Sequence, residues 1–143
     1  MQYRNMQISD YDDVMQLWDS CEGINLRDAD SPAGIASYLE RNPGLSFVAL
    51  NDSGIVGCLM AGHDGKRGYI QHLAVAPPAR RQGVAAALVE RCLEALRAQG
   101  IVKSHVHVIN SNQAGRDFWT RRGWHHRAEI EMYSFINGDN KNA

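Results

Sequence analysis

Residues 69–87 read YIQHLAVAPPARRQGVAAA and place an apolar run, a turn and the beginning of a helix in direct succession. The run from 69 to 75 alternates like a half-buried strand, with one face made of Tyr69, Gln71, Leu73 and Val75. Two prolines end the strand, because proline cannot continue a central strand. Beyond the turn, apolar residues recur at helical spacing from 84 to 99, which predicts a long helix that ends at Gly100.

The turn has the composition of a phosphate-binding site. A helix start leaves its first backbone N–H groups unpaired, and with the helix macrodipole these attract an anion by roughly 0.3 to 2 kcal/mol. Arg80 and Arg81 add positive charge beside those groups. Gly83 lets the backbone approach a pyrophosphate, and the small side chains of Ala85 and Ala86 keep the first helical turn open. The turn therefore predicts a site for a nucleotide cofactor.

A second block, residues 112–124, reads NQAGRDFWTRRGW and predicts a short helix. Ser111 or Asn112 begins this helix as its N-cap, and Gly123 ends it. Trp124 is then placed to pack back on the helix.

Both blocks resemble motifs of the GNAT acyltransferase superfamily. The spacing Arg-x-x-Gly-x-Ala, which begins at Arg80, resembles the acetyl-CoA loop of that family, whose pattern is Gln/Arg-x-x-Gly-x-Gly/Ala. The later block resembles the pattern Asn-x-x-Ala-x-x-x-Tyr-x-x-x-Gly-Phe, and its matching positions are Asn112, Gly115, Trp119, Gly123 and Trp124. The chain looks like the small single-domain bacterial members.

The resemblance implies an α/β (α+β) fold, in which a mixed, mostly antiparallel sheet has helices on both faces. The pattern along the chain predicts strand, two helices, three strands, helix, strand, helix and strand. The expected strands are residues 2–6, 45–50, 55–62, 69–75, 104–109 and 129–136. The two short helices of the first half begin at Ser9 or Asp10 and at Ser31, and the second of them ends near residues 42–44. By the resemblance, the strands at 69–75 and 104–109 splay apart to admit the thioester. We expect one N-acetyltransferase domain over residues 1–136 and a polar tail over 137–143.

The activity implied is transfer of an acetyl group from acetyl-CoA to a primary amine of a small molecule or peptide, by direct attack in a ternary complex. At pH 7 an amine with a pKa near 10.4 is neutral in only about one molecule in 2,500, so a general base is useful. In the family, a backbone N–H of the central strand, here within residues 73–75, meets the charge that develops on the thioester oxygen. A CoA-binding regulatory module with little or no turnover is the alternative.

The resemblance also implies which residues contact the cofactor. Backbone groups of the central strand would hold the pantetheine arm, the turn would hold the pyrophosphate, and the later helix would supply further contacts. In that order these residues are Leu73, Ala74 and Val75; Arg80, Arg81, Gln82, Gly83, Val84, Ala85 and Ala86; and Asn112 and Trp119.

The chain departs from the family at the general acid, because Trp119 stands where most relatives have a tyrosine. An indole N–H is far too weak an acid to protonate the departing thiolate. A leaving thiol with a pKa of about 8.5 faces a gap of only about 2 kcal/mol at pH 7, so activity is compatible with the change. Tyr133 is the nearest replacement by chain position.

Several groups could serve as the general base, and the sequence does not single one out. They are Glu22, Asp28 and Asp30 in a long polar loop, His63 and Asp64 in a turn, and Gln71 and His72 on the central strand. Glu22 and His72 are carried forward here, each against the alternative of an ordinary loop carboxylate or a packed histidine. His105 and His107 share a strand face, but no third ligand is spaced to join them, so no metal site is expected.

Composition restricts the partners. The net charge is −1 and the arginines are local, so nucleic acid is not an expected partner. Three unevenly spaced cysteines imply neither a disulfide framework nor a zinc site. With no leader and no apolar run near the roughly 18 residues of a membrane span, we expect a cytoplasmic protein without a membrane partner. The acidic loop at residues 22–30 favours a cationic acceptor, and a homodimer stays open because the family often dimerises.

Overall fold

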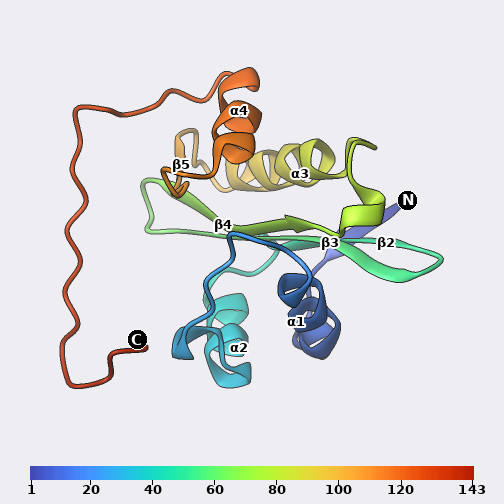
Figure 1. Ribbon diagram of the computed structural model, residues 1–143, viewed down its shortest axis with the longest axis horizontal. Coiled ribbons are helices and arrows are strands. Elements are labelled where there is room, and N and C mark those ends of the chain that lie inside the picture. Colours follow the sequence, from blue (N-terminus) through green and yellow to red (C-terminus); the bar gives the residue numbers. More distant parts are fainter. The chain divides into compact units, whose positions relative to one another are not determined.

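The computed structural model describes residues 1–143, which form two compact units, residues 1–107 and residues 108–143. The first unit contains a five-stranded sheet in the order β1-β2-β3-β4-β5 (Figure 1). The strands are β1 (Gln2–Asn5), β2 (Phe47–Asn51), β3 (Gly54–His63), β4 (Gly68–Val75) and β5 (Ser104–Val106). Neighbouring strands are antiparallel from β1 to β4, and only β4 and β5 are parallel. The predicted mixed, mostly antiparallel sheet is confirmed.

Helices cover both faces of this sheet. The helices α1 (Tyr11–Asp19) and α2 (Pro32–Arg41) lie on one face, and α3 (Val84–Ala98) lies on the other (Figure 1). α2 begins where the sequence predicts. The Ser31 hydroxyl accepts a hydrogen bond from Gly34 N at 3.1 Å, and a proline occupies the first turn. One apolar core lies under α1 and α2, where Trp18 and Ile35 pack with Cys58 of β3.

The central strand β4 carries a bulge that the sequence pattern does not show. Cys58 pairs with Ala74 and Met60 pairs with Gln71, so two residues of β4, His72 and Leu73, oppose the single residue of β3 between those pairs. Gln71 and Ala74 therefore share the face of the sheet under α1 and α2, although they are three positions apart. The predicted strict alternation over residues 69–75 is wrong beyond Gln71, because the extra residue reverses the facing of all that follows.

β4 and β5 separate after a short stretch of pairing, as the expected splay of these strands requires. β5 pairs with β4 only at Gly68, Tyr69 and Ile70, so the second half of β4 has no neighbour on that side. The strand predicted over residues 104–109 is correct in place but ends at Val106.

In the second unit, α4 (Gln113–Arg121) is the predicted short helix. Asn112 caps it by accepting a hydrogen bond from Gly115 N at 2.9 Å, and the ring of Trp124 packs edge-on against Trp119 with centroids 4.6 Å apart. The strand predicted over residues 129–136 is wrong: the segment has no strand partner, and large apolar side chains such as Phe135 are exposed. Alternating apolar and polar residues indicate which face of a strand is buried, but they do not supply a neighbouring strand for it to pair with.

No helix in the structure combines the length and apolar character that crossing a bilayer requires.

Candidate active site

The turn between β4 and α3 has the backbone of an anion site. A short 3-10 turn (Pro77–Ala79) follows β4, and then Arg81 and Gly83 both adopt left-handed conformations, with φ of +63° and +79°. Gly83 is the N-cap of α3, so the unpaired N–H groups of the first helical turn begin directly after it. A Cβ placed on Gly83 would meet no protein atom within 4 Å, so the space beside the N-cap is open.

The two arginines of the turn have different surroundings. Arg80 Nε donates to the carbonyl oxygen of Val75 at 2.9 Å, and Arg80 Nη1 lies 3.2 Å from Glu22 Oε1. Arg81 is exposed and makes no hydrogen bond or ion pair within the chain. The guanidinium of Arg81 is therefore free to bind an anion. The guanidinium of Arg80 instead connects the end of β4 to Glu22 in the first loop. Gln82 Nε2 also binds within the turn, at the carbonyl of Pro78.

Glu22, one of the predicted bases, lies beside this turn as the partner of Arg80. Its own backbone N–H and the Arg80 guanidinium hold the pKa of this fully exposed carboxyl below its usual range. A carboxylate with a lowered pKa is a weaker proton acceptor. The contact with Arg80 places Glu22 beside the turn between β4 and α3, which the sequence did not indicate.

His72, the other predicted base, lies in the bulge of β4 with a φ of +53°. Its side chain turns toward α1 and the first loop: Nε2 lies 2.8 Å from Asp30 Oδ1, and the ring packs against Trp18 with centroids 4.8 Å apart. Both members of the pair are largely buried, with side-chain exposures of 16% for His72 and 12% for Asp30. An ionised carboxylate only accepts hydrogen bonds, so Nε2 is the donor here.

Asp30 is held rigidly by its own contacts. Its second carboxylate oxygen accepts a hydrogen bond from Arg27 N at 3.0 Å, and its carbonyl accepts one from the Tyr11 hydroxyl at 2.7 Å. The residue ends a short 3-10 turn (Asp28–Asp30) that leads directly into α2. These bonds fix where the carboxylate meets the imidazole.

The other nitrogen of His72 is available for chemistry. Nδ1 makes no hydrogen bond within the chain. It is also not among the fully buried side-chain nitrogen and oxygen atoms that lack a partner, since the only such atom is Trp18 Nε1. Nδ1 is therefore accessible. With Nε2–H bound to Asp30, the lone pair of a neutral imidazole lies on Nδ1.

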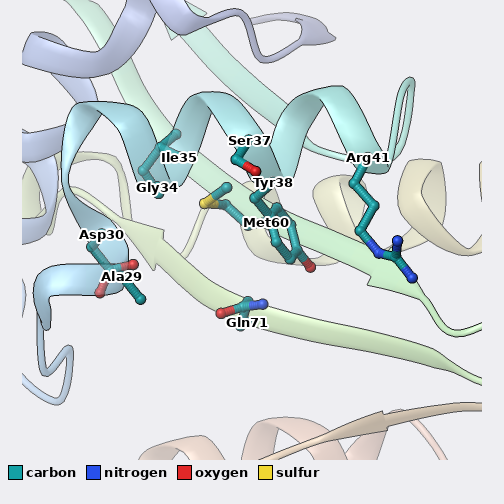
Figure 2. Close-up of a pocket in the computed structure, with 9 residues that line it drawn as sticks. All are labelled: Ala29, Asp30, Gly34, Ile35, Ser37, Tyr38, Arg41, Met60 and Gln71. Atoms are coloured by element: carbon teal, nitrogen blue, oxygen red, sulfur yellow. The ribbon is translucent and has the colours of Figure 1, made fainter. Parts of the chain in front are cut away.

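Two clefts adjoin this part of β4. A cleft of about 430 Å³ lies between α2 and β4, where Tyr38 and Arg41 project from the helix across from Gln71 (Figure 2). Its remaining lining is Ala29, Asp30, Gly34, Ile35, Ser37 and Met60. A second cleft of about 300 Å³ lies where β4 and β5 separate, and its lining is Tyr69, Ile70, Gln71, His105 and His107. Gln71, the residue before His72 in β4, lines both clefts, whereas His72 itself lines neither.

The other residues predicted to bind the cofactor or to take part in catalysis lie partly in the first unit, residues 1–107, and partly in the second, residues 108–143. Leu73 and Ala74 follow His72 in β4, and Val84, Ala85 and Ala86 form the first turn of α3. In the second unit, Asn112 uses its carbonyl oxygen to cap α4, and Trp119 is buried. Tyr133 is 91% exposed in the extended segment. Asp30 as a partner of His72, and Arg41 and Tyr38 in the cleft, were missed by the sequence because no local pattern links residues so far apart.

The chain is similar in sequence to known bacterial acetyltransferases. An acetyltransferase from Yersinia enterocolitica is 37% identical over 114 residues, which are 80% of each chain. An acetyltransferase from Pectobacterium atrosepticum is 36% identical over the same share of each chain. The protein is thus an acyltransferase. Residues 11–124 match the acetyltransferase (GNAT) family, and the chain belongs to that family.

Solved structures agree on the fold. An aminoglycoside antibiotic 6′-N-acetyltransferase from Acinetobacter haemolyticus matches with a TM-score of 0.77 at 16% identity, over 96% of this chain and 100% of that chain. The PaiA N-acetyltransferase of Thermoplasma acidophilum, in complex with coenzyme A, matches with a TM-score of 0.72 at 16% identity, over 85% and 87% of the two chains. Acetyl-CoA is the cosubstrate that this family membership gives the chain.

Proposed function

We propose that the protein transfers the acetyl group of acetyl-CoA to a primary amine of a small molecule or peptide, by direct attack in a ternary complex. The observation that carries the proposal is the His72–Asp30 pair in the β4 bulge, directly after Gln71, the residue that lines both clefts. One cleft would admit the thioester and the other the amine, so both reach the same residue of β4.

The cofactor would lie along β4 with its pyrophosphate at the start of α3. The free charge of Arg81 and the open space at Gly83 support this placement, because an anion there meets unpaired N–H groups and a cation. Backbone groups of residues 73–75 would bind the pantetheine arm. The Val75 carbonyl already accepts from Arg80 Nε, so we expect the arm to use Leu73 first. Asn112 and Trp119 stay predictions as cofactor contacts.

The bulge would supply the oxyanion donor. A bulge takes backbone groups out of the regular ladder, and here it does so at His72 and Leu73. A backbone N–H released in this way would bind the thioester oxygen as charge develops on it. This role needs no particular side chain.

His72 would act as the general base. Asp30 holds the Nε2–H tautomer, so Nδ1 takes the proton of the attacking amine while the new C–N bond forms and the C–S bond breaks. The thiolate leaves with the bonding electron pair and takes a proton from water or from the imidazolium. No tyrosine stands at the family's acid position; Tyr133 stays a prediction for that role, and a Tyr133→Phe variant tests it by its kcat.

The test follows free thiol released from acetyl-CoA across a panel of amines. We expect His72→Gln to lower kcat/KM about a hundredfold or more, which is the usual contribution of a general base. His63→Gln is the matched control, since His63 is also hydrogen-bonded, to Gln99, but lies outside the site. Unchanged activity in His72→Gln would exclude the histidine as the base and leave Glu22 as the next candidate.

Asp30 acts through His72, so its variant needs a second readout. Asp30→Ala should lower kcat with little change in the KM for acetyl-CoA. It should also shift the 15N NMR signals of His72 away from the Nε2–H tautomer. A loss of activity with the tautomer unchanged would contradict the positioning role.

We further propose a cytoplasmic location and a single functional domain over residues 1–136, and a homodimer stays an expectation. Light scattering after size-exclusion chromatography measures the oligomeric state.

A further inference from the structure

We infer that the natural acceptor is an amine that also carries an anionic group, with the dimensions of a short peptide, and that Arg41 binds this anionic group. The inference rests on the proposed function, because it needs the reacting amine to lie beside His72. The cleft between α2 and β4 would hold the acceptor along its length, with the amine at the Asp30 end and the anionic group at the Arg41 end (Figure 2).

The charges of the cleft are separated. Of its nine lining residues only Asp30 and Arg41 are charged: Asp30 lies two residues before α2, and Arg41 is the last residue of α2. Asp30 is bonded to His72 and to the backbone N–H of Arg27. Arg41 makes no hydrogen bond or ion pair within the chain, so its five N–H donors are available to a ligand. A carboxylate or phosphate is the group that the planar guanidinium binds best.

The acidic residues of the first loop do not favour a cationic acceptor. Glu22 lies against Arg80, and Asp30 lies against His72. Asp28 also has an interaction partner. The negative charge that favoured a cationic acceptor from the sequence is therefore engaged within the protein, whereas the charge of Arg41 is not.

The length of the cleft sets the size of the acceptor. The lining residues of α2 run from Gly34 to Arg41, and seven residues of helix rise about 10 Å. An extended peptide spans the same distance in about three residues. A free α-amino acid is too short to reach both ends, because its amine and its carboxylate are both attached to the same carbon.

The middle of the cleft suits peptide groups. The Ser37 and Tyr38 hydroxyls and the Gln71 amide offer donors and acceptors, and Ile35 and Met60 are apolar. Burial is the main cause that raises the pKa of Tyr38, so its hydroxyl stays protonated and able to donate at neutral pH.

The experiment compares two probes that differ in one charge, triglycine and triglycine amide, as acceptors for thiol release from acetyl-CoA. The wild type should show a KM for triglycine about fivefold to tenfold below that for the amide, as expected for a charge-assisted hydrogen bond at a partly exposed site. In Arg41→Gln the two KM values should become similar. In Arg41→Glu the order should reverse, because the carboxylate would then meet a like charge.

The chain offers a matched control in Arg97→Glu. Arg97 occupies the last turn of α3 as Arg41 occupies the last turn of α2, so both variants lose the same favourable helix-dipole interaction. Arg97 is outside the cleft, and its variant should keep the wild-type preference for triglycine.

The outcomes separate this inference from the proposed function. Equal KM values for the two probes in the wild type, or an unchanged preference in Arg41→Glu, would overturn the role of Arg41. Acetylation of spermidine but of neither peptide would overturn the peptide-like acceptor and leave the acetyltransferase intact. No thiol release with any amine, despite binding of acetyl-CoA, would overturn the proposed function as well.

Discussion

His72 and Arg81 are the only residues other than glycine with a positive φ, and both belong to the candidate active site. Such a backbone costs roughly 1–2 kcal/mol per residue, and it persists where the surrounding contacts hold it in place. For His72 those contacts are Asp30 and Trp18. Left-handed backbone at residues other than glycine is thus confined to the bulge and to the turn between β4 and α3.

At Gly83 the left-handed backbone and the open space in front of it make a direct prediction. Gly83→Ala should lower the free energy of unfolding by about 1 kcal/mol, because alanine tolerates this φ poorly. It should also weaken acetyl-CoA binding about tenfold, because the new Cβ fills the space that a pyrophosphate would approach. Chemical denaturation and calorimetric titration measure the two effects.

Gly100→Ala is the control for that experiment. Gly100 has a φ of +84° and equally open surroundings, but it lies at the other end of α3. It should lose similar stability and keep its affinity for acetyl-CoA. Equal losses of affinity in both variants would show that Gly83 acts through the stability of α3 alone.

The sequence predicted the residues of the cofactor turn but not the contacts around them. Gly83 and Arg81 follow from the local order of strand, turn and helix. The pairing of His72 with Asp30 joins residues 42 positions apart, and that of Arg80 with Glu22 joins residues 58 apart. Such pairs depend on how the elements pack, so no spacing of residues along the chain predicts them.

Among the elements, the entry into α1 depends on one ion pair. Both guanidinium nitrogens Nη1 and Nη2 of Arg4, in β1, lie 2.8 Å from the carboxylate of Asp10, the N-cap of α1. Asp10 also accepts from Gln7 N at 2.9 Å and is buried. Hydrogen bonding to Arg4 is the main cause that lowers the pKa of Asp10 below its ordinary value of 3.8.

This pair predicts a pH dependence of stability. Because the folded-state pKa of Asp10 is lowered, its contribution is fully present above the ordinary value of 3.8 and is lost as the pH falls through the folded-state pKa. At pH 7, Asp10→Asn should lower the free energy of unfolding by about 2 kcal/mol, the range of a hydrogen bond to a charged group. The difference from the wild type should shrink below pH 4 in urea titrations.

Asp52→Asn serves as the control, because Asp52 is exposed in the turn between β2 and β3. It should change stability little at either pH. A deficit of Asp10→Asn that is the same at pH 7 and pH 3 would mean that packing, and not the charge of the carboxylate, accounts for the loss.

Element boundaries that depend on local chemistry were predicted well. Ser31 and Pro32 begin α2, Gly83 precedes α3, and Asn112 caps α4, as their residue types indicate. The bulge in β4 was missed because the prediction kept a strict period of two through Gln71 and His72, two adjacent polar residues. The failure over residues 129–136 has a related cause: a period of two describes a strand's faces but does not supply a neighbouring strand.

For the whole molecule, the pairing pattern predicts where backbone protection will lie. β3 pairs with strands on both sides, whereas residues 129–136 form no strand. In hydrogen–deuterium exchange, the amides of β3 should exchange most slowly and those of 129–136 among the fastest. Protection of 129–136 similar to that of β3 would mean that this segment does pair as a strand in solution, as its alternating sequence suggested.

We expect the turn between β4 and α3 to bind acetyl-CoA and to present it to an amine at His72. The most direct test is calorimetric titration of the full chain with acetyl-CoA, beside an Arg81→Glu, Gly83→Trp double variant. We predict micromolar affinity in the wild type and its loss in the variant, which removes the free cation and fills the open space of the turn. Equal affinity in both proteins, or no binding to the wild type, would contradict the claim.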